Sequence, residues 1–334
     1  MTRAARIELA KTRLIRVVGA HGVALARTLE QKLAVAGPYN QRVNPHIITE
    51  ARNQLHDMGE LTSLSNANVR WYYLPGTPDA YIAERLAEQE PVHLAVTQDG
   101  FTKRLGQTLE ITVQRALDHN PEITYFGRYI DLSEHDDSTL YKKEEPPSHL
   151  SGRSLLGKQK LDFIINASSQ WAGIEIKNTR PWIYPQQDEL LELLRKCCAL
   201  EIVPVLIARR IPYVTGHLFR RCGLIVWETL RQRYPASEAA LAELARHKRL
   251  LGYSDITLGN EPDGPLLKFI TMNLPKVLPE ARVRFDTYKD LLSAYAYGDM
   301  SYVEFAARVR RRSEGRNEDS DEPDGIDEWL DPPW

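Results

Sequence analysis

Two short apolar runs near the middle of the chain, residues 160–167 and 171–177, constrain its fold more than any other feature. Only three polar residues separate them, so we expect the two runs to pair as an antiparallel hairpin. Side chains alternate between the faces of a strand, which puts Glu175 and Lys177 on one face and the neighbouring isoleucines on the other. The pattern predicts a buried sheet that carries charged side chains on one face.

Asp162 of the first run reaches the same face as Glu175 and Lys177 if the hairpin forms around Ser168-Ser169-Gln170. Burying two carboxylates and an ammonium group is costly unless they are paired or bind a metal ion. Mg²⁺ suits such a site, because it takes one or two carboxylates together with substrate phosphate oxygens. We therefore predict that Asp162 and Glu175 bind Mg²⁺ (or Mn²⁺) and that Lys177 holds a phosphate and the attacking water.

The elements around this hairpin resemble the core of the PD-(D/E)XK, or restriction-endonuclease-like, nuclease superfamily, which runs helix, three strands, helix, strand. The sequence predicts helices at 102–118 and 187–200 and strands at 123–130, 160–167, 171–177 and 203–208. The resemblance covers residues 102–228 and implies an α/β fold that hydrolyses phosphodiester bonds. It departs from the superfamily name at Leu161, where a proline would precede the first acid.

The resemblance also implies roles for residues outside the hairpin. Many superfamily members carry a glutamate on the first helix, and Glu110 occupies the matching position, so we expect it to complete the metal site. Several carry a glutamine after the third strand, where Gln186 or Gln187 stands, although both also suit the start of a helix. Asp131 is an alternative ligand if the strand register differs.

Other interpretations of these motifs stay open at this point. A Glu-x-Lys pair on an exposed hairpin would be a surface ion pair worth under about 1 kcal/mol. Glu30-Gln31-Lys32 has the same spacing but lies in a helical pattern with no acid on a preceding strand. The glycine and lysine spacing of residues 152–159 is similar to that of a phosphate-binding P-loop, but Gln159 stands where the P-loop has the Ser or Thr that would hold Mg²⁺.

The first 76 residues carry a second pattern, three helices followed by a hairpin. The first helix ends near Gly22, and the second is expected to begin at Val23 and stop at Gly37-Pro38. Asn44-Pro45 opens the third helix, and strands at 61–64 and 69–74 follow. This order resembles a winged helix-turn-helix, which implies binding of DNA or, alternatively, of a protein partner.

The third helix presents side chains that can read bases, because Asn, Gln and Arg form bidentate hydrogen bonds with base edges in a major groove. Arginines from the preceding loop and from the wing can contact phosphates. The predicted DNA-binding residues are Arg42, Asn44, His46, Arg52, Asn53, Gln54 and Arg70.

The net charge of −2 hides an asymmetry along the chain. Residues 313–334 hold nine acids and one arginine, so the rest of the chain has a net charge of +6. A basic body suits a polyanionic partner such as DNA. We expect the acidic tail to be disordered, and a further hypothesis is that it occupies the DNA groove beside the arginines at 308 and 310–312.

Together these patterns predict a winged helix (1–76), a connector (77–101), a nuclease domain (102–230), a helical region (231–312) and an acidic tail (313–334). Few cysteines and no long apolar run favour a cytoplasmic protein without a membrane segment. The predicted activity is that of a Mg²⁺-dependent DNA endonuclease, with restriction or antiviral defence expected by analogy. The alternatives are a non-catalytic DNA-binding regulator with a nuclease-like scaffold, or a nuclease subunit whose winged helix binds a protein. A homodimer is compatible with each.

Overall fold

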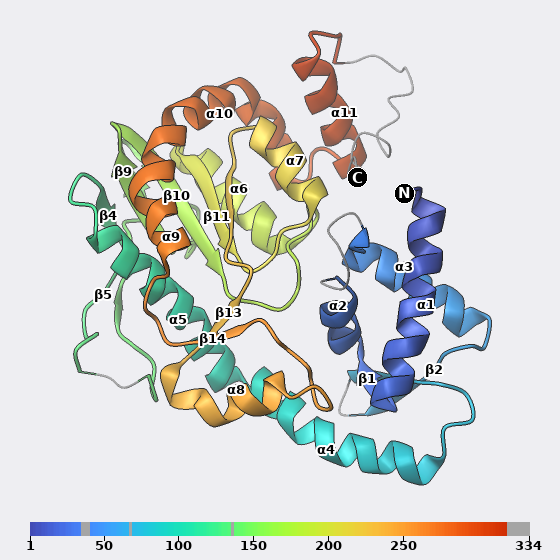
Figure 1. Ribbon diagram of the computed structural model, residues 1–334. Coiled ribbons are helices and arrows are strands. Elements are labelled where there is room, and N and C mark those ends of the chain that lie inside the picture. The colour runs from blue at the N-terminus through green and yellow to red at the C-terminus, as the bar shows by residue number, and fades with distance from the viewer. Residues whose placement is uncertain (35–40, 67–68, 135–136, 319–334) are drawn as a thin grey trace. The chain divides into compact units, whose positions relative to one another are not determined.

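The computed structural model describes residues 1–34, 41–66, 69–134 and 137–318. It is a mixed α/β protein, and its chain divides into two compact units (Figure 1). Among the described residues, the first unit comprises those of 1–103 and 238–258, and the second comprises those of 104–237 and 259–318. Within the described ranges, no helix has the length and apolarity needed to cross a lipid bilayer.

The first unit packs helices on a small antiparallel sheet with the strand order β1-β3-β2. Its core includes the fully buried Leu14, Leu29, Ile48 and Trp71. Pro45 begins the third helix, as predicted, and the β2–β3 hairpin is confirmed. The elements are α1 (Arg3–His21), β1 (Val23–Leu25), α2 (Ala26–Ala34), α3 (Pro45–Asp57), β2 (Thr62–Asn66) and β3 (Val69–Tyr73).

The second predicted helix begins later than expected. Val23 does not open it: residues 23–25 form β1, which pairs with β3 through Val23 and Tyr73. Three apolar residues are too short a run for their periodicity to separate a strand from a helix, so the distant partner strand decides the conformation. The predicted stop at Gly37-Pro38 lies outside the described residues.

The segment predicted as a connector forms the long helix α4 (Asp79–Thr97) and belongs to the first unit. Two of its buried polar residues hold the backbone of that unit. Arg85 Nε donates to the His21 carbonyl (2.9 Å), and Gln89 Nε2 donates to the Val23 carbonyl (2.8 Å). The same unit also takes α8 (Ala239–Arg246), which packs on α4, and β14 (Ile256–Leu258) from the predicted helical region.

The second unit is built on a five-stranded sheet with the order β12-β11-β10-β9-β4. β9 and β10 form the predicted antiparallel hairpin, whereas β10, β11 and β12 are parallel. The hairpin turn contains two residues, because Gln170 joins β10 opposite Ala167. Ser168 and Ser169 both have positive φ (49° and 59°), as in a type I′ turn. The strands are β4 (Thr124–Phe126), β9 (Phe163–Ala167), β10 (Gln170–Lys177), β11 (Val203–Ala208) and β12 (Ile225–Glu228).

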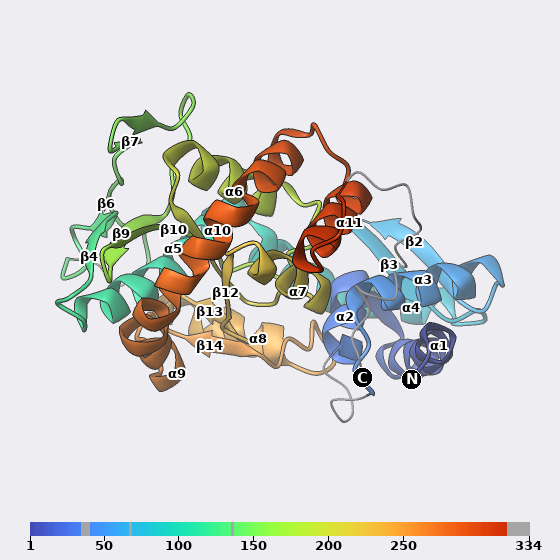
Figure 2. The same cartoon turned by 90° about the horizontal axis from the view of Figure 1, so that it is seen from above.

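Two apolar cores cover the two faces of this sheet. One is formed with α6, α7, α11 and the later part of α10, and the other with α5 and the earlier part of α10. Figure 2 shows α6 and α10 side by side. The helices are α5 (Asp99–Asp118), α6 (Asp188–Leu200), α7 (Tyr213–Arg221), η2 (Ala236–Glu238), α9 (Gly264–Lys268), η3 (Phe269–Asn273), α10 (Leu274–Tyr297) and α11 (Tyr302–Ser313).

The strand predicted at 123–130 is divided in two. Gly127 separates β4 from β5 (Arg128–Tyr129) with φ of 97°, and a Cβ atom there would lie 2.4 Å from the Asp162 carbonyl oxygen. Only glycine allows this approach of the two backbones. The polar loop predicted at 133–157 also contains short strands, and one of them pairs with β5. These strands are β6 (Lys143–Glu144), β7 (His149–Leu150) and β8 (Arg153–Ser154); β13 (Gln232–Tyr234) lies further along the chain.

Candidate functional site

Asp162 and Glu175 lie opposite each other at one end of the β9–β10 hairpin. The Asp162 amide donates to the Ile174 carbonyl (3.1 Å), and Asp162 Oδ2 accepts from the Ile176 amide (2.6 Å). These two bonds bracket Glu175, so the two acids share one face of the sheet, and Lys177 lies on that face two residues further on. The hairpin thus brings together the three charged residues that the sequence singled out.

Glu175 is buried and holds one lysine on each of its carboxylate oxygens. Lys177 Nζ donates to Oε1 (2.8 Å), and Lys196 Nζ, from α6, donates to Oε2 (3.1 Å). Although burial lowers the pKa of Lys177, the charges of Glu175 and Asp162 outweigh this and raise it above its usual value. Lys177 therefore stays charged at neutral pH, and the two hydrogen bonds hold the carboxylate in one orientation.

Glu110 joins the site through a lysine that the sequence analysis did not identify. Its Oε2 accepts from the Tyr129 hydroxyl (2.7 Å) and from Lys143 Nζ (2.5 Å). Lys143 Nζ also lies 3.7 Å from Asp162 Oδ1 and 5.1 Å from the centre of the Phe163 ring. Lys143 therefore bridges the carboxylates of Glu110 and Asp162, with aromatic rings around its ammonium group.

The fold concentrates negative charge at Asp162. Burial raises the pKa of its carboxyl group, and the nearby carboxylates of Glu110 and Glu175 raise it further, while Lys143 and Lys177 oppose the change. The net direction is upward, so the charged form of Asp162 is held at a cost. A cation beside this carboxylate would lower that cost.

The donor set fits a hard divalent cation that keeps most of its water. Within the described ranges, no three Asp, Glu, His or Cys side chains converge into an all-protein metal cage. Mg²⁺ does not require one, because it usually binds one or two carboxylates and fills its remaining positions with water and substrate oxygens. Asp162 and Glu175 supply two carboxylates on adjacent strands. Lys143 Nζ lies 3.7 Å from Asp162 Oδ1, and Lys177 and Lys196 lie 2.8 and 3.1 Å from the two oxygens of Glu175, so a metal ion held by Glu175 would share these oxygens with the lysines.

The remaining candidates of the sequence analysis have other surroundings. Gln187 precedes α6, and its Oε1 accepts from the Tyr184 amide (2.9 Å), while Gln186 is exposed. Asp131 is buried, and both of its oxygens accept from the Lys142 amide (3.0 and 3.1 Å), which shapes the loop before β6. These contacts give Gln187 and Asp131 local structural roles.

The predicted DNA-binding residues of the first unit differ in exposure. Arg42, His46, Asn53 and Arg70 are exposed, whereas Asn44, Arg52 and Gln54 are half-buried. The Arg52 guanidinium lies 4.9 Å from the centre of the Tyr72 ring, and Gln54 Nε2 donates to Glu50 Oε1 (3.4 Å). The exposed residues are therefore the ones most available to a partner.

The arginines near the end of α11 are engaged in ion pairs. Arg310 pairs with Glu314 (3.0 Å), and Arg312 pairs with Asp290 (2.7 Å) and Glu318 (2.6 Å). The first part of the acidic tail thus lies on this arginine cluster. Residues 319–334, which carry most of the tail's acids, lie outside the described residues.

The sequence signal for the two additional lysines differs. Lys196 interrupts the apolar stripe of α6 formed by Leu193, Cys197 and Leu200, so a lysine among buried positions was a detectable anomaly. Lys143 lies in a polar loop, where nothing in the local pattern marks its position. No family model, curated protein or solved structure matched the chain. Its site geometry is therefore the basis for a functional proposal.

Proposed function

We propose that this chain is a metal-dependent nuclease that hydrolyses phosphodiester bonds in DNA. The observation that carries the proposal is the convergence of Asp162, Glu175 and Lys177 on one face of adjacent strands, with the pKa of Asp162 raised by burial and by neighbouring carboxylates. The element order α5, β4, β9, β10, α6, β11 supports it, because it is similar to the core of the PD-(D/E)XK superfamily.

In this proposal Asp162 and Glu175 hold Mg²⁺ or Mn²⁺. When bound, the metal supplies a Lewis acid for the phosphoryl oxygen and lowers the pKa of a coordinated water. Lys177, already 2.8 Å from Glu175, donates to an oxygen of the scissile phosphate and keeps the attacking water near it. Lys196 holds the second oxygen of Glu175 and so orients the carboxylate.

Glu110 has a more specific role here than that of a simple metal ligand. Its carboxylate holds Lys143, whose ammonium already lies near Asp162, at the place where a second cation would bind. We therefore assign Glu110 to the positioning of Lys143. A second metal ion at Glu110 requires that Lys143 first move away.

DNA is the proposed substrate because of the first unit. Its element order α1-β1-α2-α3-β2-β3 supports a winged helix-turn-helix, and Asn53 of α3 and Arg70 of β3 are exposed. A DNA-reading unit and a nuclease unit within one chain are similar to the organisation of some restriction enzymes. By this analogy we extend the proposal to defence against foreign DNA.

The direct test incubates plasmid, linear and single-stranded DNA, and RNA, with the full chain in Mg²⁺, Mn²⁺ or EDTA. We expect cleavage of DNA with either metal, no cleavage in EDTA, and a loss of at least about 100-fold in Glu175→Gln and Lys177→Ala. Glu30→Gln is the matched control, because Glu30-Gln31-Lys32 has the same spacing on α2 and Glu30 forms an ion pair with Arg27 (2.7 Å) of the same helix.

Two results would contradict the proposal. Cleavage that persists in EDTA, or in Lys177→Ala at the wild-type rate, would exclude the assigned chemistry. Absence of cleavage together with tight, salt-dependent DNA binding would favour a non-catalytic regulator instead.

A further inference from the structure

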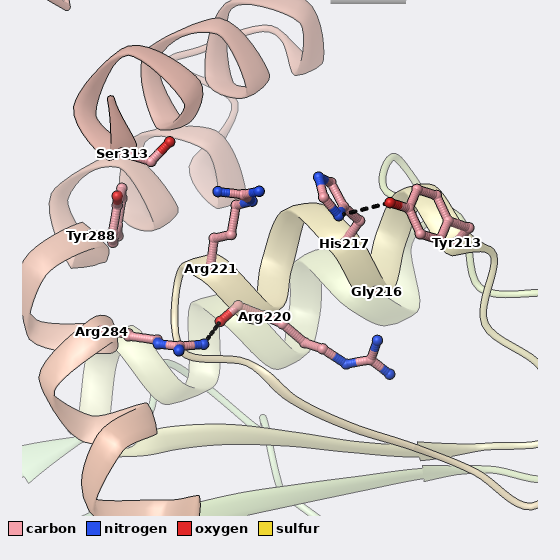
Figure 3. Close-up of a pocket in the computed structure, with 8 residues that line it drawn as sticks. All are labelled: Tyr213, Gly216, His217, Arg220, Arg221, Arg284, Tyr288 and Ser313. Atoms are coloured by element: carbon pink, nitrogen blue, oxygen red, sulfur yellow. Dashed lines mark hydrogen bonds between the residues drawn. The ribbon is translucent and has the colours of Figure 1, made fainter. Parts of the chain in front are cut away.

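A cavity of about 530 Å³ opens at α7 and is separate from the residues of the candidate nuclease site. Three arginines contribute to its wall, and none of the residues that line it is acidic. Its side chains come from α7, α10 and the end of α11, as Figure 3 shows. The residues used below are Tyr213, His217, Arg220, Arg221, Arg284 and Tyr288.

The arginines are held in place by the helices themselves. Arg284 of α10 donates to the Arg220 carbonyl (3.3 Å), and its other nitrogen pairs with Glu280 (2.5 Å). The Arg220 side chain lies back along α7, where a Cβ atom on Gly216 would be 3.1 Å from Arg220 Nη1. Among the described residues, the Arg220 guanidinium has no hydrogen bond or ion pair, so its donors face the solvent and the cavity.

His217 adds a neutral polar group to this wall. Its ring stacks on Tyr213 with centroids 5.0 Å apart, and its Nδ1 shares a hydrogen bond of 3.0 Å with the Tyr213 hydroxyl. Burial lowers the pKa of His217, and the charges of Arg221 and Arg220 lower it further. The region is therefore strongly electropositive, even without a charge on the imidazole.

A second cavity of about 260 Å³ shares Arg220 and Arg284 with the first. Its wall is mostly apolar and includes Leu224, Ile225 and Val277. Its polar groups include the amide of Asn273, which can both donate and accept, and the carboxylate of Glu280, which pairs with Arg284. This second, mostly apolar cavity, called the apolar groove below, lies next to the basic first cavity, and together they fit a ligand with two parts. One part is a flat or apolar body, and the other carries concentrated negative charge.

We propose that the two cavities bind a nucleoside phosphate, with the phosphate among Arg220, Arg221 and Arg284 and the base in the apolar groove. Arginine guanidinium groups match the geometry of phosphate oxygens and form strong charge-assisted hydrogen bonds with them. The volume of the larger cavity lies within the range of small-ligand sites. None of the residues that line the two cavities belongs to the proposed nuclease site, so this binding site is a separate one.

The test measures binding of the four nucleoside 5′-monophosphates, inorganic phosphate and an unphosphorylated nucleoside to the full chain by calorimetry. We expect saturable binding of at least one monophosphate, at least about 10-fold tighter than phosphate or nucleoside alone, because both cavities contribute. Arg220→Gln and Arg221→Gln are expected to weaken it about 10-fold or more. Arg231→Gln, an exposed arginine of the same unit, is the matched control and is expected to bind normally.

Two further arms identify the source of the ligand and separate the two proposals. A 5′-phosphorylated single strand that binds more tightly than its 5′-hydroxyl counterpart identifies a strand end as the source, and equal binding of both identifies a free nucleotide. Lys177→Ala is expected to bind the monophosphate as the wild type does, whatever its nuclease activity. Three results would each overturn the inference. The first is equal affinity for phosphate and nucleotides, and the second is a loss of nucleotide affinity in Arg231→Gln equal to that in Arg220→Gln. The third is the absence of saturable binding at millimolar concentrations.

Discussion

The buried polar groups of the two units differ in what they contact. In the first unit, the buried Arg85 and Gln89 donate to backbone carbonyls, those of His21 at the end of α1 and Val23 of β1, so each polar group supports the fold. In the second unit, the charged side chains of the candidate site pair with one another: Lys143 with Glu110 and Asp162, and Lys177 and Lys196 with Glu175. Of these side chains, Asp162 also accepts from a backbone amide of the sheet, that of Ile176. The contrast indicates which buried polar groups serve stability and which serve a function.

The strongest test of this contrast substitutes one glycine with positive φ in each unit. Gly127→Ala adds a Cβ atom 2.4 Å from the Asp162 carbonyl oxygen, so we expect a loss of about 3 to 4 kcal/mol in the free energy of unfolding. Gly59→Ala has the same kind of backbone (φ of 73°) but open space around it, and should cost about 1 kcal/mol. Urea unfolding measures both. Equal losses would mean that the contact between Gly127 and Asp162 does not constrain the site.

A second test uses the buried histidine of the first unit. Burial lowers the pKa of His21 to about 4, and the charges of Lys32 and Arg85 contribute. The folded state therefore binds the proton less readily than the unfolded chain. Stability is then complete above pH 6.5 and falls by about 3 kcal/mol as the pH drops to 4.

His21→Leu should remove this pH dependence. The measurement is urea unfolding at pH 7 and at pH 4.5, with hydrogen exchange of α1 and β1 to follow the first unit. If wild type and variant lose the same stability between the two pH values, His21 is not the group responsible.

The smallest expected effect is in the second unit. There the free energy of unfolding changes with pH in the opposite direction to the change that His21 causes. Because the pKa of Asp162 is raised in the folded state, the folded protein binds this proton more tightly, and stability declines as the pH rises between the unfolded and folded pKa values. Asp162→Asn should therefore raise the free energy of unfolding at pH 8 by about 1 kcal/mol while abolishing cleavage. A variant that is less stable than wild type at pH 8 would show that the charge contributes to stability rather than opposing it.

The sequence predicted the parts of the fold that local pattern determines. Apolar alternation located β9 and β10, and Asn44-Pro45 located the start of α3. The prediction from sequence was wrong where a distant contact determines the conformation. Residues 23–25, for example, form the strand β1 by pairing with β3. The division of the strand at Gly127 has the same origin, because it depends on the approach of Asp162.

The candidate site follows the same rule. Asp162, Glu175 and Lys177 were predictable because all three lie on one hairpin, where spacing alone determines the face of each side chain. Lys143 was not, since it reaches the site only through the pairing of β5 with β6 across a polar loop. Local spacing thus predicts a residue pair on one element, but not the partner that another element brings to it.

The two-residue turn at Ser168-Ser169 has a consequence for how such a site could be lost. Its length sets which residues of β9 and β10 face each other. If the strands took up one inserted amino acid as a shift of one residue in their register, Asp162 would face the opposite side of the sheet, although every charged residue would still be encoded. Such a one-codon change at a surface loop would separate the three charged groups without replacing any of them.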